Sequence, residues 1–229
     1  GTLERVDVNN IVINGAGAAI FIRLGNRARP FFQDGPTPGV GTLQNVSISH
    51  ITADGVGDIG CSITGIPGHA VQDIRLNDIN LSFTGGGTPD MAESPVPENE
   101  NRYPEHHMFG FLPAYGFFIR HVQDLDIRGM RLSFVESDMR PALWCEDVKN
   151  ITLFDFDGSM HAETSALIHM QHVRGGLIHG SRFSDSIHTL LSAEDTRFTI
   201  MNNDLEQIET IVKSDSLNSI RLINNSLKK

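Results

Sequence analysis

The sequence lacks the features that mark several large classes of protein. Its 229 residues contain only two cysteines, Cys61 and Cys145, too few for a disulfide scaffold or a four-thiolate zinc site. No apolar run approaches the roughly 18 residues that a membrane-spanning helix needs. Basic residues are also scarce, because 18 Lys and Arg stand against 28 Asp and Glu, for a net charge of −10. This charge disfavours nucleic acids and anionic membrane surfaces as partners.

What the sequence does contain is a repeat. A pattern with apolar residues three and five positions after its first residue recurs eight times, and its spacing settles to 22 residues. The position five along is always β-branched or leucine, as a buried stack of strands requires. The repeats begin at Leu3, Leu43, Val71, Val122, Val148, Val173, Asp195 and Leu217. The residues five positions on are Val8, Ile48, Leu76, Ile127, Leu153, Ile178, Ile200 and Leu222.

Seven positions after its start, each repeat has a residue that tolerates a left-handed backbone. A tight bend with positive φ, once per repeat, explains this column. With two further short strands per repeat, the pattern predicts a parallel β-helix, an all-β fold in which stacked coils bury a continuous core. We expect one domain over residues 1–229 with about seven or eight coils. The bend residues are Asn10, His50, Asp78, Gly129, Asp155, Gly180, Asn202 and Asn224.

Two insertions, residues 25–42 and 82–115, interrupt the repeats. They leave opposite edges of one predicted sheet, so we expect them to wall a groove across it. Strand alternation turns Ile22, Ile119 and Cys145 inward, and their neighbours toward this groove. The alternative is that these neighbours form only the polar outside of the stack. The outward residues are Phe21 and Arg23, Ser62 and Thr64, Phe118 and Arg120, Trp144 and Glu146, His169 and Gln171, then Lys213 and Asp215.

Several strings resemble a known family. They are Asn-Val-Ser-Ile at 45–48, Cys-Ser-Ile-Thr-Gly-Ile-Pro-Gly-His at 61–69, Tyr-Pro-Glu at 103–105, Met-Phe-Gly-Phe-Leu-Pro-Ala-Tyr-Gly at 108–116, Arg-His-Val at 120–122 and Arg-Pro-Ala at 140–142. Together they resemble the late coils of glycoside hydrolase family 28, the polygalacturonase and rhamnogalacturonan hydrolase family. The resemblance is closest to bacterial pectin-degrading members and covers nearly the whole chain, but only the family's C-terminal half.

The resemblance implies a right-handed β-helix, inverting hydrolysis of a pectic, uronate-containing backbone, and a secreted protein of the periplasm or the extracellular space. The opening residues lack a basic segment followed by an apolar run, so we expect no secretion signal within the sequence. The family's catalytic Asn-Thr-Asp, Asp-Asp and Gly-His-Gly motifs do not occur. The chain therefore resembles the rear portion of such an enzyme. Its first coil would need N-terminal coils or a partner chain to cover it.

Candidate binding residues follow from the outward face and from the resemblance. The family's substrate-binding Arg-Ile-Lys strand falls on residues 21–23, where Arg23 keeps a cation. Arg23 and Arg120 would hold a uronate carboxylate, and Trp144 would stack on a sugar ring. Glu146, His169 and the loop residue Tyr103 would add hydrogen bonds.

Catalysis is less well specified. Glu146 is the candidate carboxylate on the face, and an inverting hydrolase needs a second one about 6.5–9.5 Å away, for which Glu105 and Asp138 are loop candidates. The non-enzymatic alternatives are a carbohydrate-binding β-helix without turnover and a purely structural one. We expect no metal and no cofactor, because the histidine pairs do not converge and Gly85-Gly86-Gly87-Thr88 is not followed by lysine. Cys61 and Cys145 should be buried structural thiols.

Overall fold

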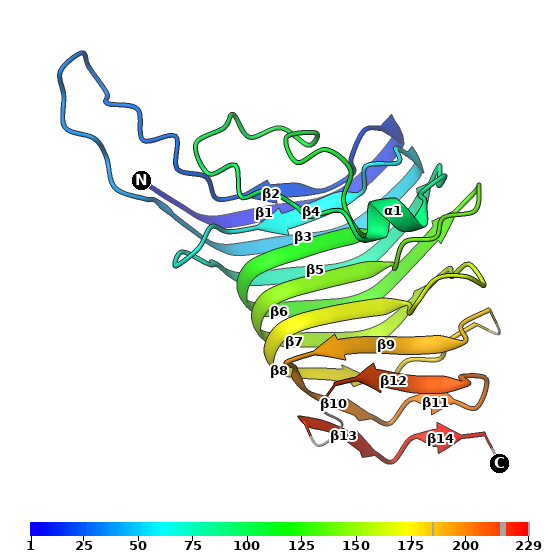
Figure 1. Ribbon diagram of the computed structural model, residues 1–229. Coiled ribbons are helices and arrows are strands. Elements are labelled where there is room, and N and C mark those ends of the chain that lie inside the picture. Colours follow the sequence, from blue (N-terminus) through cyan, green and yellow to red (C-terminus); the bar gives the residue numbers. More distant parts are fainter. Residues whose placement is uncertain (185, 216–218, 229) are drawn as a thin grey trace.

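The computed structural model describes residues 1–184, 186–215 and 219–228. Its main feature is a 12-stranded sheet in which neighbouring strands are parallel (Figure 1). Eight strands follow one another from one end to the other. They are β1 (Thr2–Ala16), β3 (Thr42–Val56), β5 (Val71–Phe83), β6 (Phe117–Phe134), β7 (Leu143–Gly158), β8 (Ile168–His179), β10 (Arg197–Met201) and β13 (Ile220–Ile223).

Shorter strands complete the fold. On one side of the stack β2 pairs with β4 and β9 with β12, and a separate parallel pair joins β11 to β14. The one helix in the described part of the chain is α1 (Pro89–Ala92), and it is far too short to cross a membrane. The protein is therefore all-β, as predicted. The short strands are β2 (Phe21–Arg23), β4 (Cys61–Thr64), β9 (Thr189–Glu194), β11 (Asp204–Leu205), β12 (Thr210–Ser214) and β14 (Ser226–Leu227).

The ladder of strands confirms the predicted apolar column. Val8 pairs with Ile48 and Ile48 with Leu76, and the pairing continues through every predicted residue of this column to Leu222. The side chains in the middle of the column are fully buried. Leu217, the predicted start of the last repeat, lies outside the described residues.

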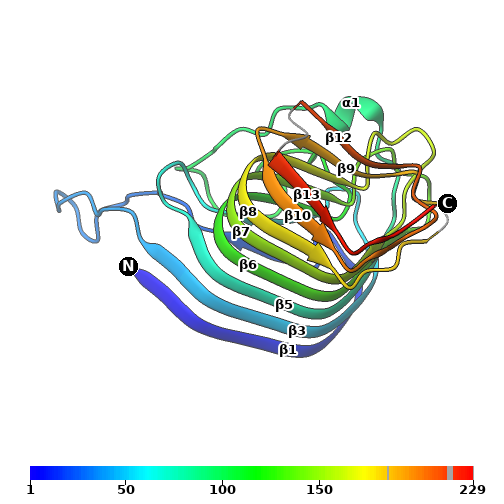
Figure 2. The same cartoon turned by 90° about the horizontal axis from the view of Figure 1, so that it is seen from below.

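The predicted bends are confirmed as well. All eight residues of the bend column have φ between 49° and 64°. Because every strand bends at the same place, successive strands follow the same outline when the stack is viewed along its axis (Figure 2). The sequence analysis missed a second such column, although most of its members are also Asn, Asp or Gly. These residues are Arg5, Asn45, Asp73, Asp124, Asn150 and Gly175.

One predicted repeat start is wrong. Arg197 pairs with Arg174, which places Asp195 level with His172 and not with Val173. Asp195 and His172 both have positive φ, so they occupy a corner and not the first strand position. The register then shifts between Arg197 and Thr199, where two residue steps in β10 lie opposite three in β8. Ile200 therefore still pairs with Ile178, and the 22-residue spacing between these two residues hid the error.

The short strands bear out the predicted inward and outward alternation. Phe21 pairs with Ser62, Ser62 with Phe118, Phe118 with Trp144 and Trp144 with His169. The inward residues between them belong to the main core, which includes Cys61 and Cys145 as free thiols. Burial raises the pKa of the Cys61 thiol to about 11 and that of Cys145 to about 12, so neither is reactive at neutral pH.

The outward column contains one level that the sequence analysis passed over. Ser192 of β9 pairs with His169 on one side and with Lys213 on the other, so Lys213 lies one level further from Trp144 than predicted. The sequence of β9 contained the signal, because the buried Leu191 and Ala193 alternate with the polar Ser192 and Glu194.

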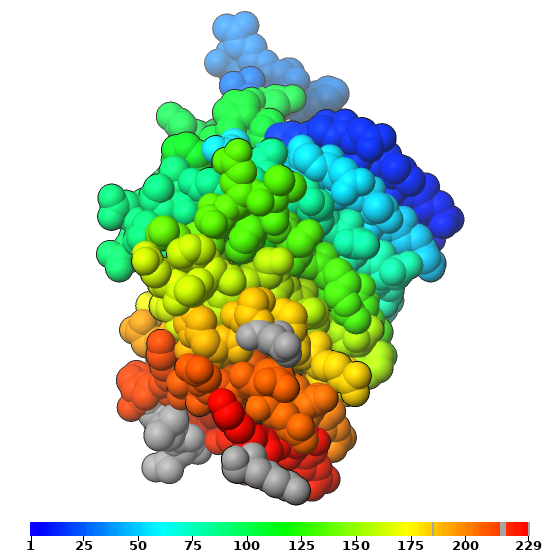
Figure 3. Space-filling model, turned by 90° about the vertical axis from the view of Figure 1, so that its right-hand side faces the viewer, coloured from blue at the N-terminus to red at the C-terminus, as the bar shows by residue number. Residues whose placement is uncertain are grey.

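The two ends of the stack differ from its middle. In the described part of the chain β1 pairs only with β3, and a hollow of about 210 Å³ opens there onto Val8, Ile13, Ile20 and Ile22. Val12 on β1 is 74% exposed. The first insertion projects away from the body beside this end, at the top of Figure 3.

Candidate functional site

The second insertion, residues 82–115, packs on the outward face of the short strands and does not form a wall beside it. Met108, Phe109 and Leu112 pack with Phe118, and the partly buried Trp144 borders this cluster. Phe118 and Arg120 are consequently almost fully buried, as are Ser62 and Thr64 beneath the same loop. The open groove expected over β2, β4 and the start of β6 is therefore covered. The loop leaves Phe21 and Arg23 of β2 partly exposed and buries the outward residues of β4 and the start of β6, and the face opens again from Trp144 onward.

Arg23 is one of the arginines that hold this loop. Its Nη1 donates to the carbonyl of Gly65 at 2.5 Å, and its Nη2 donates to the loop carbonyl of Glu98, also at 2.5 Å. Burial lowers the pKa of Arg23, and the nearby Glu98 carboxylate opposes that shift. The guanidinium also lies over the ring of Phe109, 5.2 Å from its centroid. Arg23 is thus engaged with the loop and not with the open surface.

Arg120 does the same two strands further on, with Thr64 of β4 between the two arginines. Its Nη atoms donate to the loop carbonyls of Val96 at 2.7 Å and Pro97 at 3.1 Å. Its Nη1 lies 3.3 Å from a carboxylate oxygen of Glu98 and 3.9 Å from one of Glu146. Arg120 is only 3% exposed, so a ligand carboxylate would have to displace these bonds to reach it.

The base of the loop is fixed by a buried ion pair. Arg140 Nη2 donates to Asp138 Oδ2 at 2.7 Å, and Arg140 Nε donates to Oδ1 at 2.9 Å, with both side chains fully buried. Asp138 also accepts the Gly87 N–H at 2.9 Å, and Arg140 donates to the Leu112 carbonyl at 3.2 Å. A Cβ at Gly87 would lie 2.2 Å from both partners, so this position requires glycine.

Asp138 therefore cannot serve as the second catalytic carboxylate beside Glu146. The other loop candidate, Glu105, lies 3.3 Å from His107 and lines neither of the hollows described next. Tyr103 is 62% exposed and lies under the guanidinium of Arg27, 4.9 Å away. Neither loop residue is brought to Trp144.

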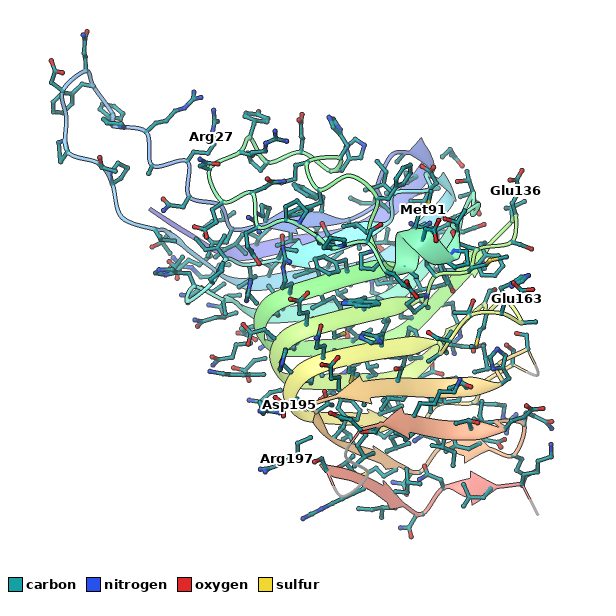
Figure 4. All side chains as sticks on the ribbon, in the orientation of Figure 1. Arg27, Met91, Glu136, Glu163, Asp195 and Arg197 are labelled. Atoms are coloured by element: carbon teal, nitrogen blue, oxygen red, sulfur yellow. The ribbon has the colours of Figure 1, made fainter. Side chains whose placement is uncertain are left out.

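Two hollows, together called here the Trp144 groove, lie between the loop and the open part of the face. Their volumes are about 260 and about 300 Å³, and Ala92, Glu93 and Trp144 line both. In Figure 4, Met91 of α1 and Glu163 lie on the same side of the stack, with Met91 above. The first hollow is also lined by Arg120, Glu146 and Gln171, and the second by Glu163, Ser165, His169 and Ser192.

The floor of the groove holds an aromatic pair, Trp144 and His169, called here the platform. The rings of Trp144 and His169 are stacked, with centroids 3.8 Å apart and an interplanar angle of 23°. Burial lowers the pKa of His169, and the Glu194 carboxylate only partly opposes this shift. The imidazole is therefore neutral at pH 7. Because the two rings stack face to face, each covers one face of the other, and only the outer faces and the ring edges remain for a ligand.

Hydrogen-bonding groups surround this platform. Gln171 Nε2 donates to Glu194 at 3.2 Å, and Lys213 Nζ donates to the Ser165 carbonyl at 3.1 Å. The side chains of Glu93 and Glu163 are exposed and have no hydrogen-bond or ion-pair partner among the described residues. The sequence analysis missed both glutamates, because each lies on an irregular segment that gives no periodic signal. No group of three or more metal-binding side chains occurs in the described residues.

Comparison with known proteins adds little. No protein-family model and no curated protein matches the sequence. Among solved structures, a Parabacteroides merdae protein named "putative glycosyl hydrolase" aligns at 13% identity over 83% of this chain and 81% of that one. Its TM-score is 0.20, so this likeness carries no argument about fold or function.

Replacing Asp138 by Asn should destabilise the protein by about 3–5 kcal/mol, because the Arg140 charge then stays buried without a counter-ion. The control is Asp126→Asn, which breaks an Asp–Arg pair of the same spacing on the surface (Arg128, 52% exposed) and should cost about 0–1 kcal/mol. Urea unfolding gives both values. Equal losses would contradict a structural role for the buried pair.

His169 should make stability depend on pH. Its folded pKa is lowered, so the unfolded chain binds the proton more readily, and stability present above pH 6.5 is lost as the pH falls below that value. His169→Phe, which keeps a ring on Trp144, should lack this component. Urea unfolding at about pH 7.5 and about pH 5 would test the difference. Parallel losses in both proteins would refute a neutral His169.

Proposed function

We propose that the chain is a right-handed parallel β-helix directed at polysaccharides, and that the Trp144 groove binds a sugar. The stacked Trp144–His169 platform is the observation that carries the proposal. A sugar ring has apolar C–H faces and a rim of hydroxyl groups. One such face can pack on the part of the Trp144 ring that His169 leaves uncovered, while neighbouring carboxylates and amides bind the hydroxyl groups. Glu146 and Gln171 supply such groups beside Trp144.

The β-helix proposal is supported by the register and the bends. One level of the stack repeats the next in pairing, in the positive-φ positions and in the inward apolar residues. A continuous core under stacked coils is the arrangement that such repeats build. We further propose that the exposed β1 edge is covered by N-terminal coils or by a partner chain, since an open edge of this kind invites pairing.

Hydrolysis is the second candidate function, and one observation favours it. Glu93 and Glu146 come from different elements and line the same hollow. Inverting hydrolysis uses two carboxyl groups, one to protonate the leaving oxygen and one to activate water. Glu146 remains our candidate on the face, and Glu93 replaces Asp138 and Glu105 as its partner. By the sequence resemblance, the substrate would be a pectic polysaccharide and the protein a secreted bacterial one.

Trp144→Ala should weaken oligosaccharide binding at least about tenfold, since stacking on a buried aromatic is worth about 1–3 kcal/mol. Titration calorimetry with pectic and neutral oligosaccharides measures the loss. The matched control is Phe154→Ala, which removes a ring that lies tilted against His179, with centroids 4.8 Å apart, elsewhere on the protein. If both variants bind like the parent protein, the groove is not the sugar site.

If the chain is hydrolytic, Glu146→Gln should abolish reducing-end release from methyl-esterified polygalacturonate or from rhamnogalacturonan, because the amide neither gives nor takes the required proton. Glu105→Gln, a loop carboxylate outside the groove, should keep full activity. Release that survives in Glu146→Gln would exclude this carboxylate from catalysis. No release from the folded parent protein would leave binding as the function of the chain.

A further inference from the structure

We infer that the Trp144 groove selects an uncharged sugar unit and rejects a uronate at the same position. This inference rests on the proposed sugar binding and adds the class of sugar. The inference is argued from the charged side chains that line the groove, most of which are carboxylates. Glu93 lines both hollows, Glu146 lines the first and Glu163 the second.

The cations of this region are already engaged. Arg120 is the only Lys or Arg among the described residues that lines either hollow, and its Nη atoms bond to loop carbonyls while Glu98 and Glu146 balance its charge. Lys213 Nζ is hydrogen-bonded to Ser165 at the margin of the second hollow. Lys213 itself lines neither hollow. The groove therefore carries a net negative charge.

The residues on the floor of the groove do not change its net negative charge. His169 is neutral at pH 7, because burial disfavours its charged form. A carboxylate on a sugar packed on Trp144 would therefore meet like charges, and Arg120, the one Lys or Arg of the described residues that lines the hollows, is buried under the loop. A neutral sugar offers hydroxyl hydrogens instead, and ionised glutamates accept these in charge-assisted hydrogen bonds. The same three glutamates thus favour one class of ligand and oppose the other.

The test compares one sugar with and without its charge. Tetragalacturonate and its fully methyl-esterified form have the same backbone, so titration calorimetry of both at low salt isolates the carboxylate. We expect the ester to bind at least about tenfold more tightly than the acid. Glu93→Gln combined with Glu163→Gln should bring the two affinities together, and so should about 0.5 M NaCl, because salt screens exposed charges. Asp7→Asn on β1, which also removes one carboxylate, should leave the difference unchanged.

The outcomes separate this inference from the proposal beneath it. Equal or tighter binding of the acid, lost in Trp144→Ala, would overturn the inference and keep the groove as a sugar site. Binding of neither form, with no binding of neutral galactan or arabinan oligosaccharides either, would overturn both. A preference for the ester that persists in the double glutamine variant would assign the selectivity to groups other than these glutamates, and would also overturn the inference.

Discussion

The buried ion pair between Asp138 and Arg140 determines where the second insertion lies. It binds the loop at both ends, through the amide of Gly87 and the carbonyl of Leu112. Such a pair stabilises a fold little compared with apolar packing, but an unpaired member would be costly, so the loop is held in one position. The glycines at 85–87 belong to this arrangement, because Gly85 and Gly86 have positive φ and a side chain at Gly87 would overlap the pair.

The position of the second insertion determines which part of the outward face is accessible. Once the loop lies on the face, it covers Phe118 and engages Arg23 and Arg120, and its segment around Glu93 forms one wall above Trp144. The accessible surface is therefore displaced along the stack, from the strands nearest β1 toward β7, β8 and β9. Beyond the start of β6, the platform of Trp144 and His169 is the first part of the outward face that the loop leaves open.

The fold was readable from the sequence because each level repeats the same local requirements. A bend with positive φ leaves Asn, Asp, His or Gly at a fixed position, and an inward position leaves an aliphatic residue. The site was less readable, because the loop docks through contacts between residues far apart in sequence. One signal was present, since Phe21 and Phe118 are large apolar residues in the outward column and an exposed face would not favour them. Glu93 and Glu163 gave none.

The use of the arginines bears most directly on specificity. A guanidinium that is almost fully buried under a loop, and that donates to two of its carbonyls, can reach a ligand carboxylate only if the loop opens. Opening would leave those carbonyls unsatisfied, at about 1–3 kcal/mol for each buried group. Arg120 is in this position, and its carboxylate neighbours Glu98 and Glu146 offset its charge. An arginine on the outward face of the sequence pattern is therefore not necessarily available to bind a ligand. In this protein the residues that first suggest affinity for acidic sugars act instead on the loop, and the glutamates that remain accessible favour a neutral one.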